Sequence, residues 1–116
     1  MNINERSRNT AKILIDIGAI NFSLVTPFRL SSGFLSPSYI DCRKIIAYPS
    51  AFKSITDMMI DTIKSEMVAQ SPDYIIGGET AGIPFAAAIA EKMGLPLSYV
   101  RKKPKDYGKS KLIEGE

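Results

Sequence analysis

The sequence has no histidine, no tryptophan and a single cysteine among its 116 residues. Without histidine, the chain carries neither a Ser-His-Asp nor a Cys-His catalytic arrangement, and it lacks the commonest zinc ligand. The one cysteine, Cys42, excludes an internal disulfide and suits a reducing compartment, and we expect it to be a small buried side chain. Any metal would therefore be a hard cation such as magnesium, held by carboxylates or by substrate phosphates.

Long hydrophobic runs are also missing. The uncharged and mostly apolar stretch Thr80–Ala90 contains glycine and proline and is far too short to span a bilayer. The first residues lack the apolar segment of a signal peptide. Because 45% of the residues are apolar and 23% are charged, the composition is that of a single globular domain. These features predict a cytoplasmic protein that does not enter a membrane.

Positive charge is concentrated late in the chain. Residues 101–116 hold six of the fifteen Lys and Arg and three of the twelve acidic residues, so they account for the whole formal net charge of +3. We call residues 101–108 the basic loop. A basic loop on a neutral body indicates a local anion site, but a simple basic tail has the same composition. Charge alone leaves both interpretations open.

Hydrophobic spacing predicts an α/β fold. Apolar residues recur at helical spacing in three segments, so we expect helices over residues 4–17, 49–68 and 83–92. Strands are expected as short pieces within residues 19–41 and as apolar segments at residues 73–77 and 97–101. In the second helix, Met59 and Met67 are expected in the core. This order of elements is typical of a parallel sheet with crossover helices, although two such strands do not complete one.

A small-residue turn, Gly77-Gly78-Glu79-Thr80-Ala81-Gly82, follows the first of these strands. Ligands bind at this place in open α/β sheets, where glycines expose backbone N–H groups beside a helix N-terminus. The turn matches neither the dinucleotide fingerprint nor the Walker A pattern, and tight turns need glycine in any case. A phosphate site and a plain turn are therefore equally open. Glu79 is either a local cap partner or a residue that helps to order a magnesium-bound substrate.

A second candidate segment, residues 30–41, is rich in serine and leads to Tyr39. Its hydroxyl groups and flat aromatic ring suit a planar ligand. Taken alone, the same residues favour a surface hairpin.

Three motifs, in this order and spacing, resemble orotate phosphoribosyltransferases. They are S-S-G-x-x-S-P-x-Y-I-D at residues 31–41, G-G-E-T-A-G-I-P at 77–84 and Y-V-R-K-K-P-K-D-Y-G-x-x-x-x-I-E-G at 99–115. The resemblance implies a phosphoribosyltransferase-type, Rossmann-like parallel sheet with an N-terminal helix and a small β hood. It also implies transfer of ribose 5-phosphate from phosphoribosyl pyrophosphate to orotate, which gives orotidine 5′-monophosphate in pyrimidine (UMP) biosynthesis.

The resemblance further implies roles for individual residues near the base. Tyr39 and Ile40 fall where the family contacts orotate. Ser31 stands where many members have a lysine that contacts a phosphate or orotate. Thr80 and Ala81 fall in the turn that approaches the pyrophosphate.

The basic loop corresponds to the family's lid. Arg101, Lys102 and Lys105 fall where the lid grips the phosphates, and Lys105 is the implied catalytic residue. Tyr107 replaces a histidine of many members and keeps a hydroxyl that can donate a hydrogen bond. The resemblance implies Mg²⁺ bound through the substrate pyrophosphate, with no metal ligand from the protein. It also implies a homodimer, because the lid reaches into the neighbouring subunit's site.

The resemblance predicts two parts. Residues 1–48 would form the N-terminal helix and hood strands, and residues 49–116 the first part of the α/β core, ending in the basic loop. The family's central phosphoribosyl pyrophosphate-binding strand would follow Gly115, so we expect an N-terminal portion that is inactive alone. The alternatives are a non-catalytic remnant, a partner subunit, or a polyanion-binding module. Nucleic acid is disfavoured because Tyr107 is the only aromatic residue in the basic loop.

Overall fold

The computed structural model describes residues 1–104 and 112–115. These residues belong to two compact units, Met1–Lys53 and Ser54–Glu116. Helix α2 passes from the first unit into the second. None of the helices in the described part of the chain is long and apolar enough to cross a membrane.

The first unit starts with helix α1 (Ile3–Asp16), close to the predicted range. A capping box fixes its start, because the Asn2 side chain accepts from the Glu5 N–H at 2.9 Å and Glu5 accepts from the Asn2 N–H at 3.2 Å. Gly18, at φ +71°, follows the last turn in the left-handed conformation that ends many helices. The sequence alone therefore determines this helix.

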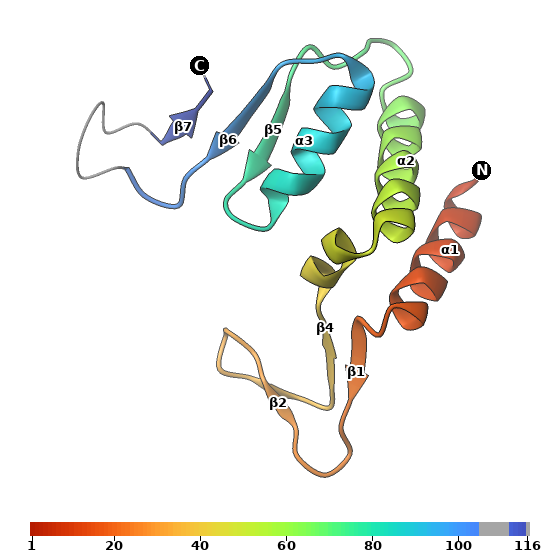
Figure 1. Ribbon diagram of the computed structural model, residues 1–116, viewed down its shortest axis with the longest axis vertical. Helices are drawn as coiled ribbons and strands as arrows, with labels where there is room; N and C mark the ends of the chain where they lie inside the picture. The colour runs from red at the N-terminus through yellow and green to blue at the C-terminus, as the bar shows by residue number, and fades with distance from the viewer. Residues whose placement is uncertain (105–111, 116) are drawn as a thin grey trace. The chain divides into compact units, whose positions relative to one another are not determined.

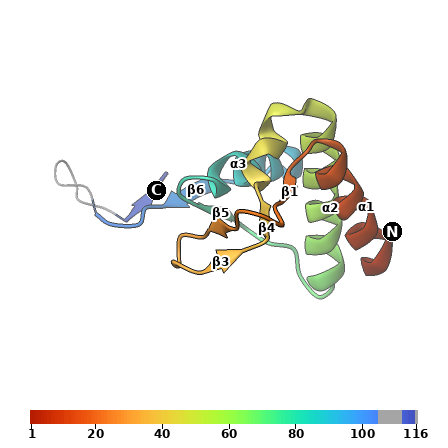
Figure 2. The same cartoon turned by 90° about the horizontal axis from the view of Figure 1, so that it is seen from below.

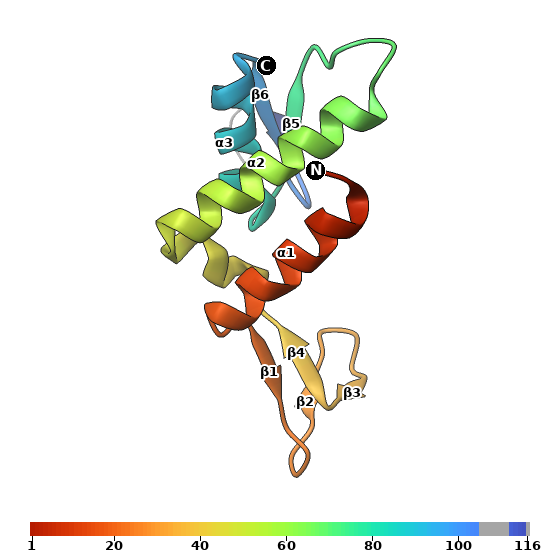
Figure 3. The same cartoon turned by 90° about the vertical axis from the view of Figure 1, so that its right-hand side faces the viewer.

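Four short strands follow in two antiparallel pairs. Strand β1 (Ile20–Phe22) pairs with β4 (Ser38–Ile40), and β2 (Phe28–Arg29) pairs with β3 (Leu35–Ser36). The β2–β3 hairpin leaves the end of β1 and leads back into β4, as Figures 2 and 3 show. The predicted hood of short strands is confirmed.

A 3₁₀ helix, η1 (Cys42–Ala47), follows β4 and was not predicted. Asp41 caps it by accepting a hydrogen bond from the Arg43 N–H at 3.2 Å. The expectation that Cys42 is buried is wrong, because it lies at the exposed start of η1 while Ile45 is the residue that η1 buries.

Helix α2 (Pro49–Glu66) matches the predicted second helix, but its buried face is different. Ile55 and Met58 are buried, whereas Met59 and Met67 are 38% and 37% exposed. The prediction for Met59 is wrong because α2 carries apolar residues on more than one face, and Ile55 belongs to both possible stripes. Spacing alone does not distinguish the two stripes. The prediction for Met67 is wrong because this residue lies just beyond the end of α2, where helical spacing no longer applies.

A strand–helix–strand unit forms the centre of the second unit. Strand β5 (Ile75–Gly78) runs parallel to β6 (Leu97–Val100), and helix α3 (Gly82–Met93) connects them and packs against both (Figure 1). All three elements agree with the predicted ranges. In the part of the chain that the structure describes, β5 has no partner strand on its other edge.

A third strand, β7 (Ile113–Glu114), lies antiparallel to β6 and was not predicted, because two residues give no periodic signal. Tyr74 helps to hold its end. The Tyr74 hydroxyl lies 2.8 Å from Oγ of buried Ser98 and donates to the Gly115 carbonyl at 3.3 Å. Gly115 has φ +96°, and a Cβ there would lie 2.8 Å from the Leu97 carbonyl oxygen. Only glycine allows β7 to end so close to β6.

Candidate functional site

The turn between β5 and α3 presents an uncapped helix N-terminus. Ala81 is the N-cap of α3 and makes no side-chain cap, and the first turn has no acidic residue. The first N–H groups of a helix lack intrahelical partners and carry the positive end of the helix dipole. Thr80 and Ala81 are exposed there. This geometry suits an anion that approaches the backbone.

The glycines of this turn differ in their packing. A Cβ on Gly77 would lie 2.7 Å from the Ala86 Cβ and 3.0 Å from the Gly82 carbonyl oxygen, so close packing of β5 on α3 requires glycine there. A Cβ on Gly78 would meet no atom within 4 Å. Packing therefore explains Gly77, while Gly78 leaves its backbone open to a ligand.

The basic loop begins at the same edge of the sheet. Because β5 and β6 are parallel, their carboxyl ends meet, and the Glu79 N–H donates to the Val100 carbonyl at 2.9 Å. On the opposite side of β6, the Arg101 N–H donates to the Leu112 carbonyl at 2.7 Å. The structure thus brings the predicted residues Thr80 and Ala81 to the same sheet edge as the start of the basic loop.

Arg101 carries a buried polar atom that has no partner among the described residues. Its Nε is buried, and no described residue accepts a hydrogen bond from it. A phosphate oxygen that reached this atom would give it the acceptor that the described residues do not supply. Of the other predicted loop residues, Lys102 is exposed, and Lys105 and Tyr107 lie outside the described residues.

Glu79 links the turn to the loop. Its carboxylate accepts a hydrogen bond from the Lys102 N–H, 23 residues further along the chain. Glu79 therefore does not cap the adjacent helix α3, whose N-cap has no side-chain partner. Sequence reasoning named Glu79 but could not find this contact, because nothing in the spacing shows which strand lies beside β5.

The residues with a predicted role in orotate binding lie in the first unit. Tyr39 and Ile40 are on β4, where Ile40 is 53% exposed, and Ser31 lies exposed in the turn between β2 and β3. The Tyr39 ring packs against Phe28, with 5.9 Å between ring centroids. The structure describes this group within the first unit and the turn and loop within the second.

Arg43 holds the Tyr39 hydroxyl, a contact that the sequence analysis missed. Arg43 Nη2 donates to Tyr39 Oη at 3.2 Å, and Nε donates to Asp41 Oδ1 at 2.9 Å. The hydrogen bond from Arg43 lowers the pKa of the Asp41 carboxyl below its ordinary value. It also raises the pKa of the Arg43 guanidinium. The four-residue spacing from Tyr39 to Arg43, with Asp41 between them, was the available signal.

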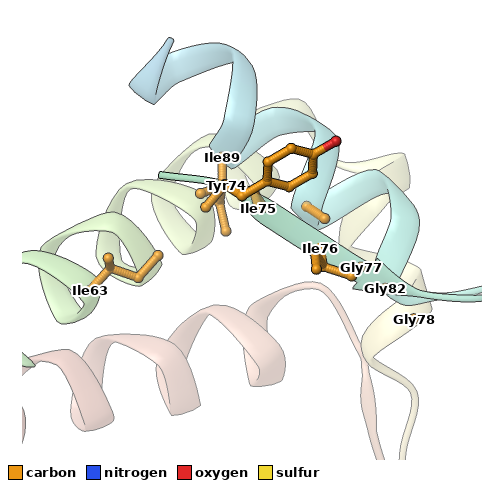
Figure 4. Close-up of a pocket in the computed structure, with 9 residues that line it drawn as sticks. Ile63, Tyr74, Ile75, Ile76, Gly77, Gly78, Gly82 and Ile89 are labelled. Carbon is orange, nitrogen blue, oxygen red and sulfur yellow. The ribbon is translucent and has the colours of Figure 1, made fainter. Parts of the chain in front are cut away.

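A pocket of about 380 Å³ lies along β5 between α2 and α3. Figure 4 shows Tyr74, Ile63 and Ile89 toward one end and Gly77, Gly78 and Gly82 together at the other. Its nine lining residues include no charged side chain, so the pocket offers an anion no side-chain cation. No group of three or more Cys, Asp or Glu residues in the described ranges is arranged to hold a metal ion.

No family model matches the chain. The orotate phosphoribosyltransferase of Roseobacter denitrificans is 50% identical over 111 residues, which cover 96% of this chain and 49% of that protein. The orotate phosphoribosyltransferase of Cereibacter sphaeroides is 51% identical over 111 residues, covering 96% of this chain and 48% of that protein. The chain is related to the orotate phosphoribosyltransferases. It spans about half the length of these curated relatives, in agreement with the predicted N-terminal portion.

Solved structures support the same relationship. The orotate phosphoribosyltransferase of Aeropyrum pernix superposes with a TM-score of 0.70 at 31% identity, over 92% of this chain and 56% of that one. The UMP synthase of Leishmania donovani gives a TM-score of 0.66 at 32% identity, over 93% of this chain and 22% of that one. An adenine phosphoribosyltransferase, at 21% identity and a TM-score of 0.64, shares the fold. The predicted phosphoribosyltransferase-type fold is confirmed.

Proposed function

We propose that this chain supplies the pyrophosphate-binding side of an orotate phosphoribosyltransferase. The whole protein would transfer ribose 5-phosphate from phosphoribosyl pyrophosphate to orotate and release pyrophosphate. One observation carries the proposal: the uncapped N-terminus of α3 and the start of the basic loop lie at the same edge of the sheet. Similarity to orotate phosphoribosyltransferases over 96% of the chain adds the choice of orotate as the acceptor.

The chemistry requires what this edge offers. Displacement at the anomeric carbon gives the sugar oxocarbenium character while the leaving pyrophosphate keeps several negative charges. Fixed donors that face this leaving group stabilise the transition state more than the ground state. Backbone N–H groups at Thr80 and Ala81 and the Arg101 guanidinium would serve as such donors. No histidine base is required for this step.

The remaining residues of the basic loop extend the same role. Lys102, and beyond it Lys105 and Tyr107, would contact the phosphates, with Lys105 as the catalytic cation. A loop that closes over the substrate would also exclude water, which otherwise hydrolyses the activated sugar. These assignments rest on the motif at residues 99–115.

Orotate would lie against the first unit. Tyr39 offers a flat ring and a hydroxyl whose oxygen already accepts a hydrogen bond from Arg43, so its proton is available to a ligand acceptor. Ile40 and Ser31 would complete this contact. We propose that Ser31 replaces the lysine of many relatives with a neutral hydroxyl.

Magnesium, a homodimer and a cytoplasmic location belong to the same proposal. Mg²⁺ is usually held by substrate phosphates and a few carboxylates, so it would arrive with the pyrophosphate and neutralise part of its charge. A partner subunit would complete the site through its own basic loop.

Two measurements test the proposal. Isothermal titration of the chain with magnesium pyrophosphate should show binding that Arg101→Met weakens, because the substitution removes the buried donor. Lys64→Met, an exposed cation on α2, is the matched control and should bind as the wild type does. Equal affinity of the Arg101 variant and the control would reject the site.

The second measurement is turnover. The chain with orotate, phosphoribosyl pyrophosphate and magnesium should show no orotate consumption, because the relatives are about twice as long. Steady turnover that Lys105→Ala abolishes would show that these 116 residues suffice.

A further inference from the structure

Two residues beyond the end of β6, the Lys102 N–H is a donor that no strand of the described sheet satisfies. Successive N–H groups of a strand point to opposite sides, so Val100 and Lys102 face β5 while Arg101 faces β7. Arg101 finds the Leu112 carbonyl at 2.7 Å. On the other side, β5 ends at Gly78 and the chain turns into α3, so no strand carbonyl continues the ladder beside Lys102.

Glu79 takes the place of that missing strand. Its backbone N–H donates to the Val100 carbonyl at 2.9 Å, which is the last rung of the parallel ladder. Its side chain then reaches one step further and accepts from the Lys102 N–H. One residue therefore binds β6 and the basic loop at two successive points, and it directly precedes Thr80.

We propose that Glu79 is a positioning residue that fixes the first residues of the basic loop against the pyrophosphate-binding turn. The role in pyrophosphate binding rests on the proposed function, whereas the hydrogen bond between Glu79 and Lys102 does not depend on it. With the Lys102 backbone held by Glu79, the first residues of the loop stay beside the turn before any anion arrives. Such preorganisation reduces the entropic cost of ordering the loop when the ligand binds.

The proposal separates two roles of the carboxylate. A positioning residue needs only an acceptor oxygen at this place, which glutamine also supplies. A magnesium ligand needs the negative charge, which glutamine lacks. Glu79→Gln should therefore behave as the wild type does, whereas Glu79→Ala should release Lys102.

The direct test is the exchange of the Lys102 amide proton with water, measured by NMR on the chain. Glu79→Ala should exchange this proton about fivefold faster, the effect of losing one net hydrogen bond. Glu79→Gln should exchange at the wild-type rate. Glu91→Ala, an exposed glutamate on α3, is the matched control and should change nothing. An unchanged Lys102 rate in Glu79→Ala, or equal acceleration in both Glu79 variants, would overturn the proposal.

Titration of the same samples with magnesium pyrophosphate tests the functional consequence. We expect Glu79→Ala to bind more weakly and Glu79→Gln to bind like the wild type. Equal weakening in both, with Lys102 still protected in Glu79→Gln, would make Glu79 a metal ligand and overturn the positioning role. If the wild type binds no pyrophosphate, the proposed function fails, while the exchange rates still decide whether Glu79 positions the loop.

Discussion

Substituting the two adjacent glycines at the end of β5 separates packing from ligand binding. Gly77→Ala would place a methyl group 2.7 Å from the Ala86 Cβ and 3.0 Å from the Gly82 carbonyl oxygen. Ordinary contacts between carbon atoms are about 3.5–4.0 Å, and both neighbours belong to the rigid part of α3. The helix must therefore move away from the strand, at a cost of about 1–3 kcal/mol.

Gly78→Ala is the matched control. Its new methyl group meets no atom within 4 Å, and Gly78 is not among the glycines with positive φ. Replacing glycine with alanine at a compatible position stabilises a protein by about 0.4–1 kcal/mol, because the unfolded chain loses freedom. The two variants should therefore differ by about 1.4–4 kcal/mol in free energy of unfolding.

Urea unfolding followed by far-UV circular dichroism measures this difference. The midpoint should fall for Gly77→Ala and stay or rise for Gly78→Ala, with similar slopes. Equal midpoints would refute the close packing of β5 on α3. The proposed function adds a second readout, since Gly78→Ala should weaken the binding of magnesium pyrophosphate without loss of stability. Unchanged affinity would remove Gly78 from the anion site.

Two further predictions concern charged contacts. Lys92 Nζ donates to the hydroxyl of the fully buried Thr56 at 2.7 Å. Lys92→Met should therefore lower the free energy of unfolding by about 1.5 kcal/mol, whereas the control Lys64→Met should change it little. Equal urea midpoints for the two variants would contradict this. Arg43→Met removes the hydrogen bond that lowers the pKa of Asp41. The midpoint of the Asp41 carboxyl in an NMR titration should therefore rise toward its ordinary value. An unchanged midpoint would rule out the pairing of Arg43 with Asp41. Because the pKa of Asp41 is lowered in the folded chain, its contribution to stability is present above the unfolded pKa and is lost as the pH falls through the folded one.

Local signals predicted the regular elements well. Apolar spacing predicted α1 and α2, and the structure adds the capping box at Asn2 that fixes the start of α1. Met59 was assigned to the wrong face of α2 because apolar residues lie on more than one side of that helix. Strand β7 was missed because two residues form a strand only when a neighbour such as β6 supplies their hydrogen bonds.

For the candidate site too, some features follow from the sequence and others only from the tertiary structure. Residue types and order in the sequence determined the three motifs, the absence of histidine chemistry and the basic loop, since these depend on composition and spacing alone. Tertiary structure decided that the α3 N-terminus and the start of the basic loop share a sheet edge. It also decided that Gly77 serves packing and that Glu79 binds Lys102 rather than its own helix. The shared edge and the Glu79 contact depend on pairing between residues more than twenty positions apart, and the role of Gly77 depends on how α3 packs on β5. No local pattern encodes either.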